Sequence, residues 1–346
     1  MVWRQRAAAI GVGLFLSLAI FGVGEIAARL LWHPPAIGLA QYDPHYGTHD
    51  KKGRAHPEQP GRFHSWERDP LTGEPIYDVE YDIDDQLRRI TPVSPEGPRG
   101  HFALFFVDSF TFGEGVRGDQ TLPYYVGAMA PDYRPYNYAF HGGGPSDLLS
   151  RLEDGDLRGQ VAEPSGVLIY TFIDHHIDRT VGTLRMISTW GRGKPCYEVT
   201  SDGSVAFRGP FKKAHPVRDL VYRALGASRL LAWLGLDWPL QIGDAEFDTT
   251  ARVLARSKQL FEEQFPGSRF VVAIYPGTNA RGLALVPYLD RLGVETLDLS
   301  GLFDKQKAEA TLSPRDGHPS PLAYRRYARA LVDRLGLASS GAAPGG

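Results

Sequence analysis

Three polar side chains in this sequence have the types and spacing that nucleophilic catalysis requires. Ser109 directly follows the apolar run Phe102 to Val107, while Asp316 and His318 stand two residues apart near the other end of the chain. Side chains two apart in an extended segment project to the same side, so Asp316 can bond one imidazole nitrogen of His318 while the other faces Ser109. The three residues are therefore candidates for a nucleophile, its base and the group that orients the base.

Each of these residues also has a simpler interpretation. A serine after a strand often only caps the helix that follows, and a histidine in a polar loop is usually just solvated. The position of Ser109 favours the catalytic interpretation, because ligands of open α/β sheets bind beyond the carboxyl ends of the strands. The combination of a buried strand, a serine and a late Asp316-Gly317-His318 segment before a closing helix is more specific than any one of these features.

The segments around these residues alternate between strand-length apolar runs and helical patterns. The expected strands cover residues 102–107, 166–173, 270–275 and 294–299, and the expected helices cover residues 122–129, 147–152, 249–264, 283–292 and 321–335. Strands that are apolar throughout and alternate with helices indicate a parallel sheet covered on both faces. The sequence therefore predicts a three-layer α/β/α fold with a mostly parallel sheet over residues 99–337.

Three further regions have a different character. Residues 34–98 are rich in Pro, Gly, Asp and His and are expected to form an extended arm with a hairpin. Residues 186–240 hold an Asp202-Gly203 turn between β-prone flanks and a helical pattern from Pro216 onward, and we expect them to be an insertion near the rim of the site. The Gly- and Ala-rich residues 338–346 are expected to be a disordered tail.

The N-terminal segment predicts where the chain resides. Two arginines precede an uncharged apolar run from Ala7 to Gly24, which resumes after Glu25. This length spans a bilayer core of about 30 Å, and the positive-inside rule then places the arginines in the cytoplasm and the rest of the chain on the periplasmic side. Residues 1–33 are thus expected to be a single-pass membrane anchor. A cleaved signal peptide is the alternative, since Gly22 and Gly24 are small enough to flank a cleavage site.

The composition limits the class of partner and cofactor. The 346 residues include 38 basic and 40 acidic side chains, which offers no electrostatic footprint for nucleic acid and favours a small or neutral partner. Cys196 is the only cysteine, which excludes an internal disulfide and a thiolate metal cluster. Asp174, His175 and His176 are expected to line the cleft. A metal site there is disfavoured, because adjacent histidines in a strand point to opposite faces, and we expect neither a metal nor a cofactor.

Three segments resemble the sequence blocks of the SGNH/GDSL hydrolases. Residues 105–115 are similar to the first block, which usually reads Gly-Asp-Ser and here reads Val-Asp-Ser followed by Phe-Thr-Phe-Gly-Glu-Gly. Residues 137–145, Asn-Tyr-Ala-Phe-His-Gly-Gly-Gly-Pro, resemble the second block, and residues 316–318 resemble the last. The order of the blocks agrees over residues 99–335, and the anchor and arm look like those of exported bacterial members. The resemblance implies a flavodoxin-like SGNH fold.

This resemblance also implies a mechanism. His318 would take the proton from Ser109 as the serine attacks an ester carbonyl, Asp316 would stabilise the imidazolium, and water would release the acyl group. The oxyanion would be held by the main-chain N–H groups of Ser109 and Gly142, where glycine lets the backbone approach the substrate closely. A plain tight turn is the alternative for the glycine run.

Two positions depart from the family's pattern. Val107 stands where glycine is usual and crowds the turn before the nucleophile. Ile173 stands where the third block supplies an asparagine side chain to the oxyanion hole, and isoleucine cannot donate a hydrogen bond. Loss of one such donor costs on the order of a hundredfold or more in rate, so another group is expected to substitute. The candidates are His175, His176 and Asn279, of which we favour His176.

The leading hypothesis is an esterase outside the cytoplasm that removes an acetyl or other short acyl group from a carbohydrate or lipid. An acyltransferase, in which a sugar hydroxyl resolves the acyl-enzyme, needs the same serine and base, so the sequence does not separate the two. A catalytically silent carbohydrate-binding relative is the third hypothesis, favoured by the missing asparagine and opposed by the intact triad. Tyr124, His141, Trp190 and the insertion are expected to shape the pocket.

Overall fold

A five-stranded parallel sheet forms the centre of the protein, with the strand order β7-β6-β8-β11-β12. These strands are β6 (His101–Phe106), β7 (Tyr133–Asn137), β8 (Ser165–Phe172), β11 (Arg269–Ile274) and β12 (Glu295–Asp298). Numbered along the chain, the order is 2-1-3-4-5, the flavodoxin-like arrangement, and the strand order reverses between β6 and β8. The structure is a computed structural model that describes residues 2–34, 39–93, 97–236, 239–304 and 306–338.

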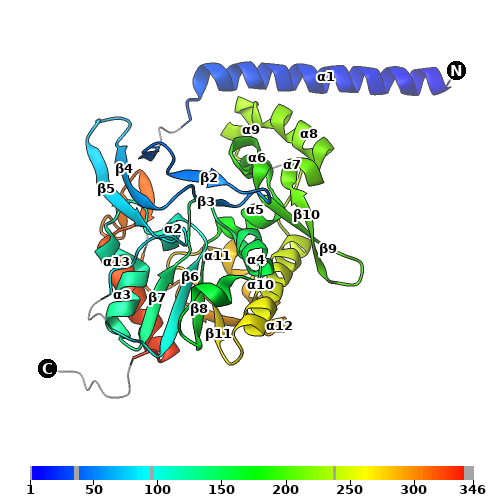
Figure 1. The fold of residues 1–346 in the computed structure, drawn as a ribbon. Helices are drawn as coiled ribbons and strands as arrows, with labels where there is room; N and C mark the ends of the chain where they lie inside the picture. The colour runs from blue at the N-terminus through cyan, green and yellow to red at the C-terminus, as the bar shows by residue number, and fades with distance from the viewer. Residues whose placement is uncertain (1, 35–38, 94–96, 237–238, 305, 339–346) are drawn as a thin grey trace.

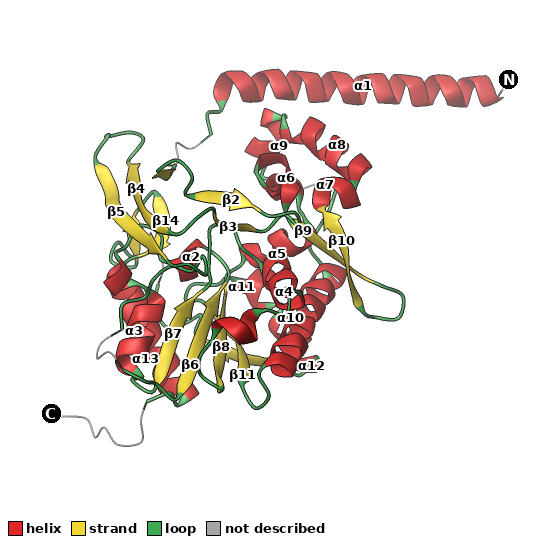
Figure 2. Ribbon diagram, viewed as in Figure 1, coloured by secondary structure: helices red, strands yellow, loops and turns green. Residues whose placement is uncertain are grey.

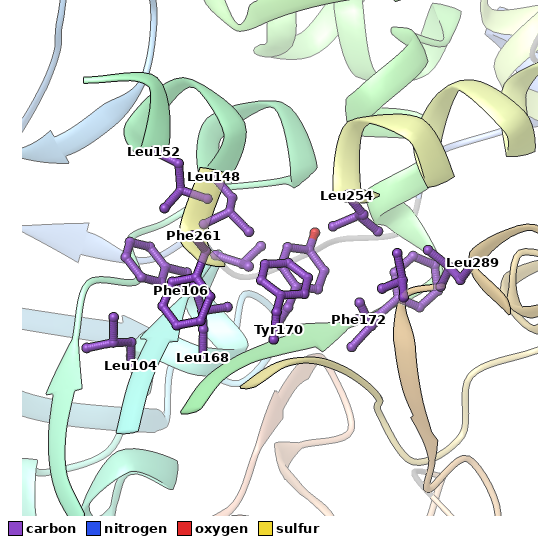
Figure 3. Packing of buried hydrophobic residues seen from close by; sticks show 14 of the residues in the cluster. Leu104, Phe106, Leu148, Leu152, Leu168, Tyr170, Phe172, Leu254, Phe261 and Leu289 are labelled. Carbon is purple, nitrogen blue, oxygen red and sulfur yellow. The ribbon is translucent and has the colours of Figure 1, made fainter. Parts of the chain in front are cut away.

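Helices cover both faces of this sheet (Figure 2). One face packs against α4 (Pro145–Glu153), α10 (Asp244–Gln264) and α12 (Val286–Arg291), and the other against α3 (Leu122–Met129) and α13 (Pro321–Leu335). Successive side chains of a strand point to opposite faces, so in β6 Leu104 and Phe106 enter the first layer while Ala103 and Phe105 enter the second. Figure 3 shows the first layer, where side chains from β6 and β8 meet those of the three helices. Both faces are buried, which explains why the strands are apolar throughout.

The predicted three-layer α/β fold is therefore confirmed. Three helical predictions differ in their bounds: α4 is longer than the predicted 147–152, α10 begins earlier, at Asp244, and the pattern over 283–292 is divided between α11 (Ala280–Leu283) and α12. The sequence analysis missed β7, an edge strand with the sequence Tyr-Arg-Pro-Tyr-Asn. Proline is tolerated at a sheet edge, where one side of the strand has no partner, but it weakens the strand pattern in the sequence.

The arm forms small antiparallel sheets against the end of the central sheet where β6 finishes. Its strands are β1 (Gln41–Tyr42), β2 (Gly47–His49), β3 (Ala55–Pro57), β4 (Gly61–Arg68) and β5 (Pro75–Ile83), with β2 paired to β3 and with β4 between β1 and β5. Aromatic side chains of the arm, including Tyr46 and Tyr81, share one apolar cluster with Phe112 of α2 (Ser109–Phe112). The arm thus holds two hairpins rather than the one expected, and it packs directly on the helix that begins at Ser109.

The region from 175 to 236 contains short helices and a hairpin. Its elements are α5 (His175–Val181), α6 (Leu184–Thr189), β9 (Pro195–Val199), β10 (Val205–Pro210), α7 (Phe211–Ala214), α8 (Pro216–Gly226) and α9 (Arg229–Trp233). The hairpin turns at Asp202-Gly203, as the sequence indicated. α5 contradicts the sequence interpretation, which treated His175 and His176 as strand residues. β8 ends at Phe172 and the chain enters a helix almost at once.

The structure describes the N-terminal helix but not the last residues of the chain. α1 (Val2–Leu31) contains a stretch, Ala9–Leu31, that is long and apolar enough to cross a membrane, with a mean hydropathy of 2.0, and residues 9–20 of it are exposed throughout. A membrane anchor and a signal sequence both have this length and composition. The disordered tail predicted for 338–346 lies, from residue 339 onward, outside the described residues.

Short elements complete the fold: η1 (Gly118–Gln120), η2 (Leu157–Gln160), η3 (Gly191–Gly193), β13 (Thr311–Ser313) and β14 (Asp316–Pro319).

Candidate active site

The structure brings Ser109, His318 and Asp316 into one hydrogen-bonded chain. Ser109 opens α2 just beyond the carboxyl end of β6, at the point where the strand order reverses, and His318 and Asp316 both lie on β14. The Oγ of Ser109 lies 2.8 Å from His318 Nε2, and His318 donates from Nδ1 to Asp316 Oδ1 over 2.5 Å. The same carboxyl oxygen accepts the main-chain N–H of His318 at 3.0 Å. The predicted spacing therefore does place both side chains on one side of an extended segment.

The surroundings of His318 fix its ring and favour its protonated form. The ring of Phe110 lies 5.4 Å from the imidazole, measured between centroids, and Asp316 is buried. Burial alone would lower the pKa of His318, but the hydrogen bond and charge of Asp316, helped by Glu114 and Asp108, raise it above its ordinary value. The carboxylate thus stabilises the imidazolium that forms when a base accepts the proton of a serine.

The turn before Ser109 has a backbone conformation that favours glycine. Val107 has a φ of 119°, which costs a β-branched residue on the order of 1–3 kcal/mol. Its carbonyl oxygen accepts the N–H of Phe140 at 3.3 Å, and a side chain at Gly143 would collide with that oxygen. The crowding expected from Val107 is therefore real. The close approach of the glycine loop to this turn is what requires glycine at 143.

The glycine loop carries one of the two predicted oxyanion donors. Gly142 has a φ of 70°, and the ring of Trp190 packs against its Cα. Among the described residues, neither the N–H of Ser109 nor that of Gly142 donates to a protein acceptor. Both groups are thus free to bond a ligand. Trp190 remains 49% exposed and lies beside Gly142.

A buried ion pair joins the nucleophile turn to the glycine loop. Arg179 on α5 donates from Nη1 to Asp108 Oδ2 at 3.0 Å and to the carbonyl oxygen of Gly143 at 2.6 Å. Asp108 is fully buried and caps α2 by accepting the N–H of Phe110. Burial would raise the pKa of Asp108, but the hydrogen bonds from His176 and Arg179 and the charge of Arg179 hold it well below its usual range. Arg179 therefore fixes the two segments that carry the N–H donors.

His176 does not replace the missing asparagine, so that prediction is wrong. Its side chain is fully buried, and burial lowers its pKa. The neutral ring donates from Nε2 to Asp108 at 3.0 Å and accepts the hydroxyl of Tyr170 at Nδ1, also at 3.0 Å. Because both ring nitrogens are engaged, His176 supports Asp108 and does not line the cleft. Ile173 is buried as well.

The other candidates near Ile173 bond locally. Asp174 accepts the main-chain N–H of Asn279 at 3.0 Å, and the side chain of Asn279 caps α11 by accepting the N–H of Gly282 at 3.1 Å. His175 is exposed on the first turn of α5, 3.7 Å from the carboxylate of Asp178. These contacts hold α5 against α11. In this arrangement the Asn279 side chain is used as a helix cap, not as an oxyanion donor.

Glu114 is a buried charge whose role the sequence analysis missed. Its Oε1 accepts the hydroxyls of three arm tyrosines, Tyr42, Tyr77 and Tyr81, at 3.1, 2.8 and 3.3 Å, and its Oε2 accepts Nδ1 of His141. Burial opposes ionisation, yet the charge and hydrogen bond of His141 lower the pKa of Glu114 to about 2. The network fixes the arm to the loop that carries Gly142. The only sign of this role in the sequence is that Glu114 stands between two glycines after an apolar segment.

Two of the three predicted pocket residues lie beside this loop. His141 precedes Gly142, and its Nε2 lies 2.5 Å from the hydroxyl of Tyr46, while Trp190 packs on Gly142 itself. Tyr124 lies in α3, with its ring 5.4 Å from that of Tyr125. Trp190 is therefore placed beside the N–H of Gly142, whereas both ring nitrogens of His141 are engaged by Glu114 and Tyr46.

No protein-family model and no curated protein matches this chain. Its structure is similar to solved G-D-S-L lipolytic proteins. One, from Veillonella parvula DSM 2008, has 11% identity and a TM-score of 0.38, and the match covers 67% of this chain and 97% of that one. A family two carbohydrate esterase from Clostridium thermocellum has 8% identity and a TM-score of 0.40, with 74% of each chain covered.

An acetyl xylan esterase from the rumen bacterium Butyrivibrio proteoclasticus is similar to the same extent. Its identity is 10% and its TM-score 0.40, and the match covers 72% of this chain and 66% of that one. Identities and TM-scores this low describe a distant likeness. The inference about function therefore rests on the geometry of Ser109, His318 and Asp316.

Proposed function

We propose that this protein is a serine hydrolase of esters that works through an acyl-enzyme on Ser109. One observation carries the proposal: the hydroxyl of Ser109, the imidazole of His318 and the buried carboxylate of Asp316 form a continuous hydrogen-bonded chain. This is the arrangement of a nucleophile with its base and the group that orients the base. It lies at the carboxyl ends of the parallel strands, where open α/β sheets bind ligands.

The geometry defines what each residue would do. His318 Nε2 accepts the proton of Ser109 as Oγ bonds to the carbonyl carbon of the ester, and Asp316 stabilises the imidazolium. The tetrahedral intermediate then expels the alcohol, which takes the proton from His318. Water, deprotonated by the same nitrogen, attacks the acyl carbon, and the carboxylic acid leaves Ser109 with its hydroxyl restored.

Main-chain groups would hold the oxyanion. The N–H groups of Ser109 and Gly142 have no protein acceptor among the described residues, so they are available to the developing negative charge. No asparagine side chain adds a third bond, because Ile173 occupies that position. We expect Arg179 to act as a positioning residue, since it holds Asp108 and Gly143, the neighbours of the two donors.

The proposed substrate is a short acyl ester of a carbohydrate or lipid outside the cytoplasm. The exposed face of Trp190 beside Gly142 supports this class, because an indole ring provides an apolar surface for a sugar ring or an acyl chain. The location is proposed from the length and composition of α1. A catalytically silent role is disfavoured by the 2.8 Å contact between Ser109 and His318.

The test is hydrolysis of a chromogenic acetate ester by the full chain in detergent. Ser109→Ala is expected to lower kcat/KM by about a thousandfold or more, since it removes the nucleophile. Ser201→Ala, in the exposed turn between β9 and β10, is the matched control and should leave the rate unchanged. Equal rates for wild type and Ser109→Ala would contradict the proposal. Turnover that appears only with an added sugar acceptor would identify an acyltransferase.

A further inference from the structure

The exposed surface of α8 and α9 is apolar. We call it the α8–α9 face, and it consists of Val217, Leu220, Val221, Trp233, Leu234 and Leu236, which are all 40% to 74% exposed. In α8 the first three are spaced i, i+3, i+4 and so share one side of the helix. The other side is buried against the small core of the insertion through Tyr222, and Asp219 is buried too. α8 thus has two apolar sides, and only one of them is covered by protein.

The start of α9, next to this face, is bonded to the helix that is long enough to cross a membrane. The carboxylate of Glu25 on α1 accepts the N–H groups of Arg229 and Leu230 at 2.9 and 3.0 Å and the hydroxyl of Ser228 at 2.7 Å, so it caps α9. Arg29 donates to the carbonyl of Ala227 at 3.1 Å. Figure 1 shows α1 running across this side of the molecule, over α8 and α9.

The arrangement leaves the N-terminal part of α1 exposed. Its contacts with the body come from residues near its C-terminal end, whereas residues 9–20 are exposed throughout. Because Glu25 and Arg29 near the C-terminal end of α1 are bonded to the start of α9, a bilayer that encloses residues 9–20 has its surface close to the α8–α9 face. The apolar side chains there would otherwise stand in water.

The charges around the face suit the surface of a membrane. Residues 211–236 contain five basic side chains and one acidic one, although the whole chain has a formal charge of −2. The single acid, Asp219, is buried and paired with Arg192 at 2.6 and 2.7 Å. Lys212 and Lys213 are exposed at the edge of the face. Apolar side chains with a basic rim and an interfacial tryptophan are typical of segments that lie in the headgroup region of anionic membranes.

We propose that the α8–α9 face docks on the anionic surface of the bilayer into which α1 inserts. The membrane is then contacted twice, by a spanning helix and by a helix pair lying in its surface, and the body cannot swing freely about residue 34. This inference rests on α1 being a membrane segment. It does not depend on the proposed ester hydrolysis, so a failure of the docking proposal would leave that function open, and the reverse holds too.

The test uses the full chain with Cys196→Ser, which leaves no native thiol, and one added cysteine carrying an environment-sensitive fluorophore. The probe sites are Leu220→Cys on the face, Ser17→Cys inside α1, and Asp290→Cys on α12 as an exposed control. Each protein is placed as a single chain in nanodiscs of phosphatidylglycerol and phosphatidylcholine. Nitroxide-labelled lipid is then added to the disc as a quencher.

We expect the probe at 220 to be quenched and blue-shifted, approaching the probe at 17, while the probe at 290 stays unquenched. Adding Val221→Asp and Leu234→Asp to the Leu220→Cys protein should reduce the quenching, because these exposed positions no longer favour lipid. A probe at 220 as unquenched as that at 290, or an unquenched probe at 17, would overturn the proposal. A blue shift that appears only with two chains per disc, without lipid quenching, would assign the face to a second copy and overturn it as well.

Discussion

At the scale of single residues, the protonation of His318 decides when the site can act. The imidazole must be neutral to accept the proton of Ser109. Burial lowers its pKa, but the bond and charge of Asp316 outweigh burial and raise that pKa above its ordinary value of about 6.5. The kcat/KM for an ester is therefore expected to fall as the pH drops through a midpoint above 6.5, because the base becomes protonated there.

Asp316→Asn is the matched change for this prediction. It keeps the shape of the side chain but removes the charge that favours the imidazolium. We expect the acid limb of the pH profile to move to lower pH and the maximal rate to fall by about a thousandfold or more. A profile whose midpoint is the same in wild type and Asp316→Asn would show that this carboxylate does not set the pKa of the base.

Arg179 provides a second prediction at this scale. It holds the residues next to both N–H donors, so Arg179→Lys, which keeps the charge but not the paired contacts, is expected to lower kcat by about tenfold to a hundredfold with little change in KM. Arg281→Lys is the control, because Arg281 also pairs with a carboxylate, that of Asp178 on α5, in a more exposed contact. Equal kcat values for the two variants would argue against a positioning role for Arg179.

At the scale of elements, β4 of the arm places a carboxyl group beside the triad. Glu67 is buried, and no hydrogen-bond donor reaches its side chain among the described residues. Burial, followed by the negative charge of Asp316, raises the pKa of Glu67 to about 7, although the charge of His318 opposes this shift. The folded protein therefore binds this proton more tightly than the unfolded chain does, and the stability that results is lost as the pH rises through about 7.

Glu67→Gln should remove the part of the pH dependence of stability that comes from this carboxyl group. We expect the variant to gain stability relative to wild type between pH 5 and pH 8, by roughly 1–2 kcal/mol, since at pH 8 the wild type holds an unpaired buried charge. Thermal unfolding of both proteins across this range measures the difference. A stability difference between the two proteins that stays constant, or that narrows toward pH 8, would contradict the assigned direction of the pKa shift of Glu67.

Features whose sequence signal lies within one short segment were predicted, whereas features that depend on distant partners were not. α3 and α13 were predicted with the bounds that the structure shows, because each has apolar periodicity and a cap in its own segment. The triad was predicted because Ser109 follows a buried strand and Asp316 lies two residues from His318. Arg179 and Glu114 were missed, since their partners are as far as 71 and 72 residues away and a sequence does not show that a charge is buried.

At the scale of the whole molecule, α1 determines how the protein partitions. If the helix stays in the membrane, the expressed full chain should remain in the membrane fraction after an alkaline carbonate wash, which releases proteins held only at the surface. A cleaved signal would instead give a soluble protein that is shorter by the mass of the removed segment. Fractionation followed by intact-mass measurement distinguishes the two, and the shortened soluble form would contradict the anchor.

The central claim is that Ser109 is an activated nucleophile, and covalent labelling tests it most directly. The full chain would be treated with a fluorophosphonate, digested and analysed by mass spectrometry. We predict one adduct, on the peptide that contains Ser109, with labelling strongly reduced in His318→Ala because the base is gone. No adduct on Ser109, or labelling that is unchanged in His318→Ala, would contradict the account of this site as a serine hydrolase.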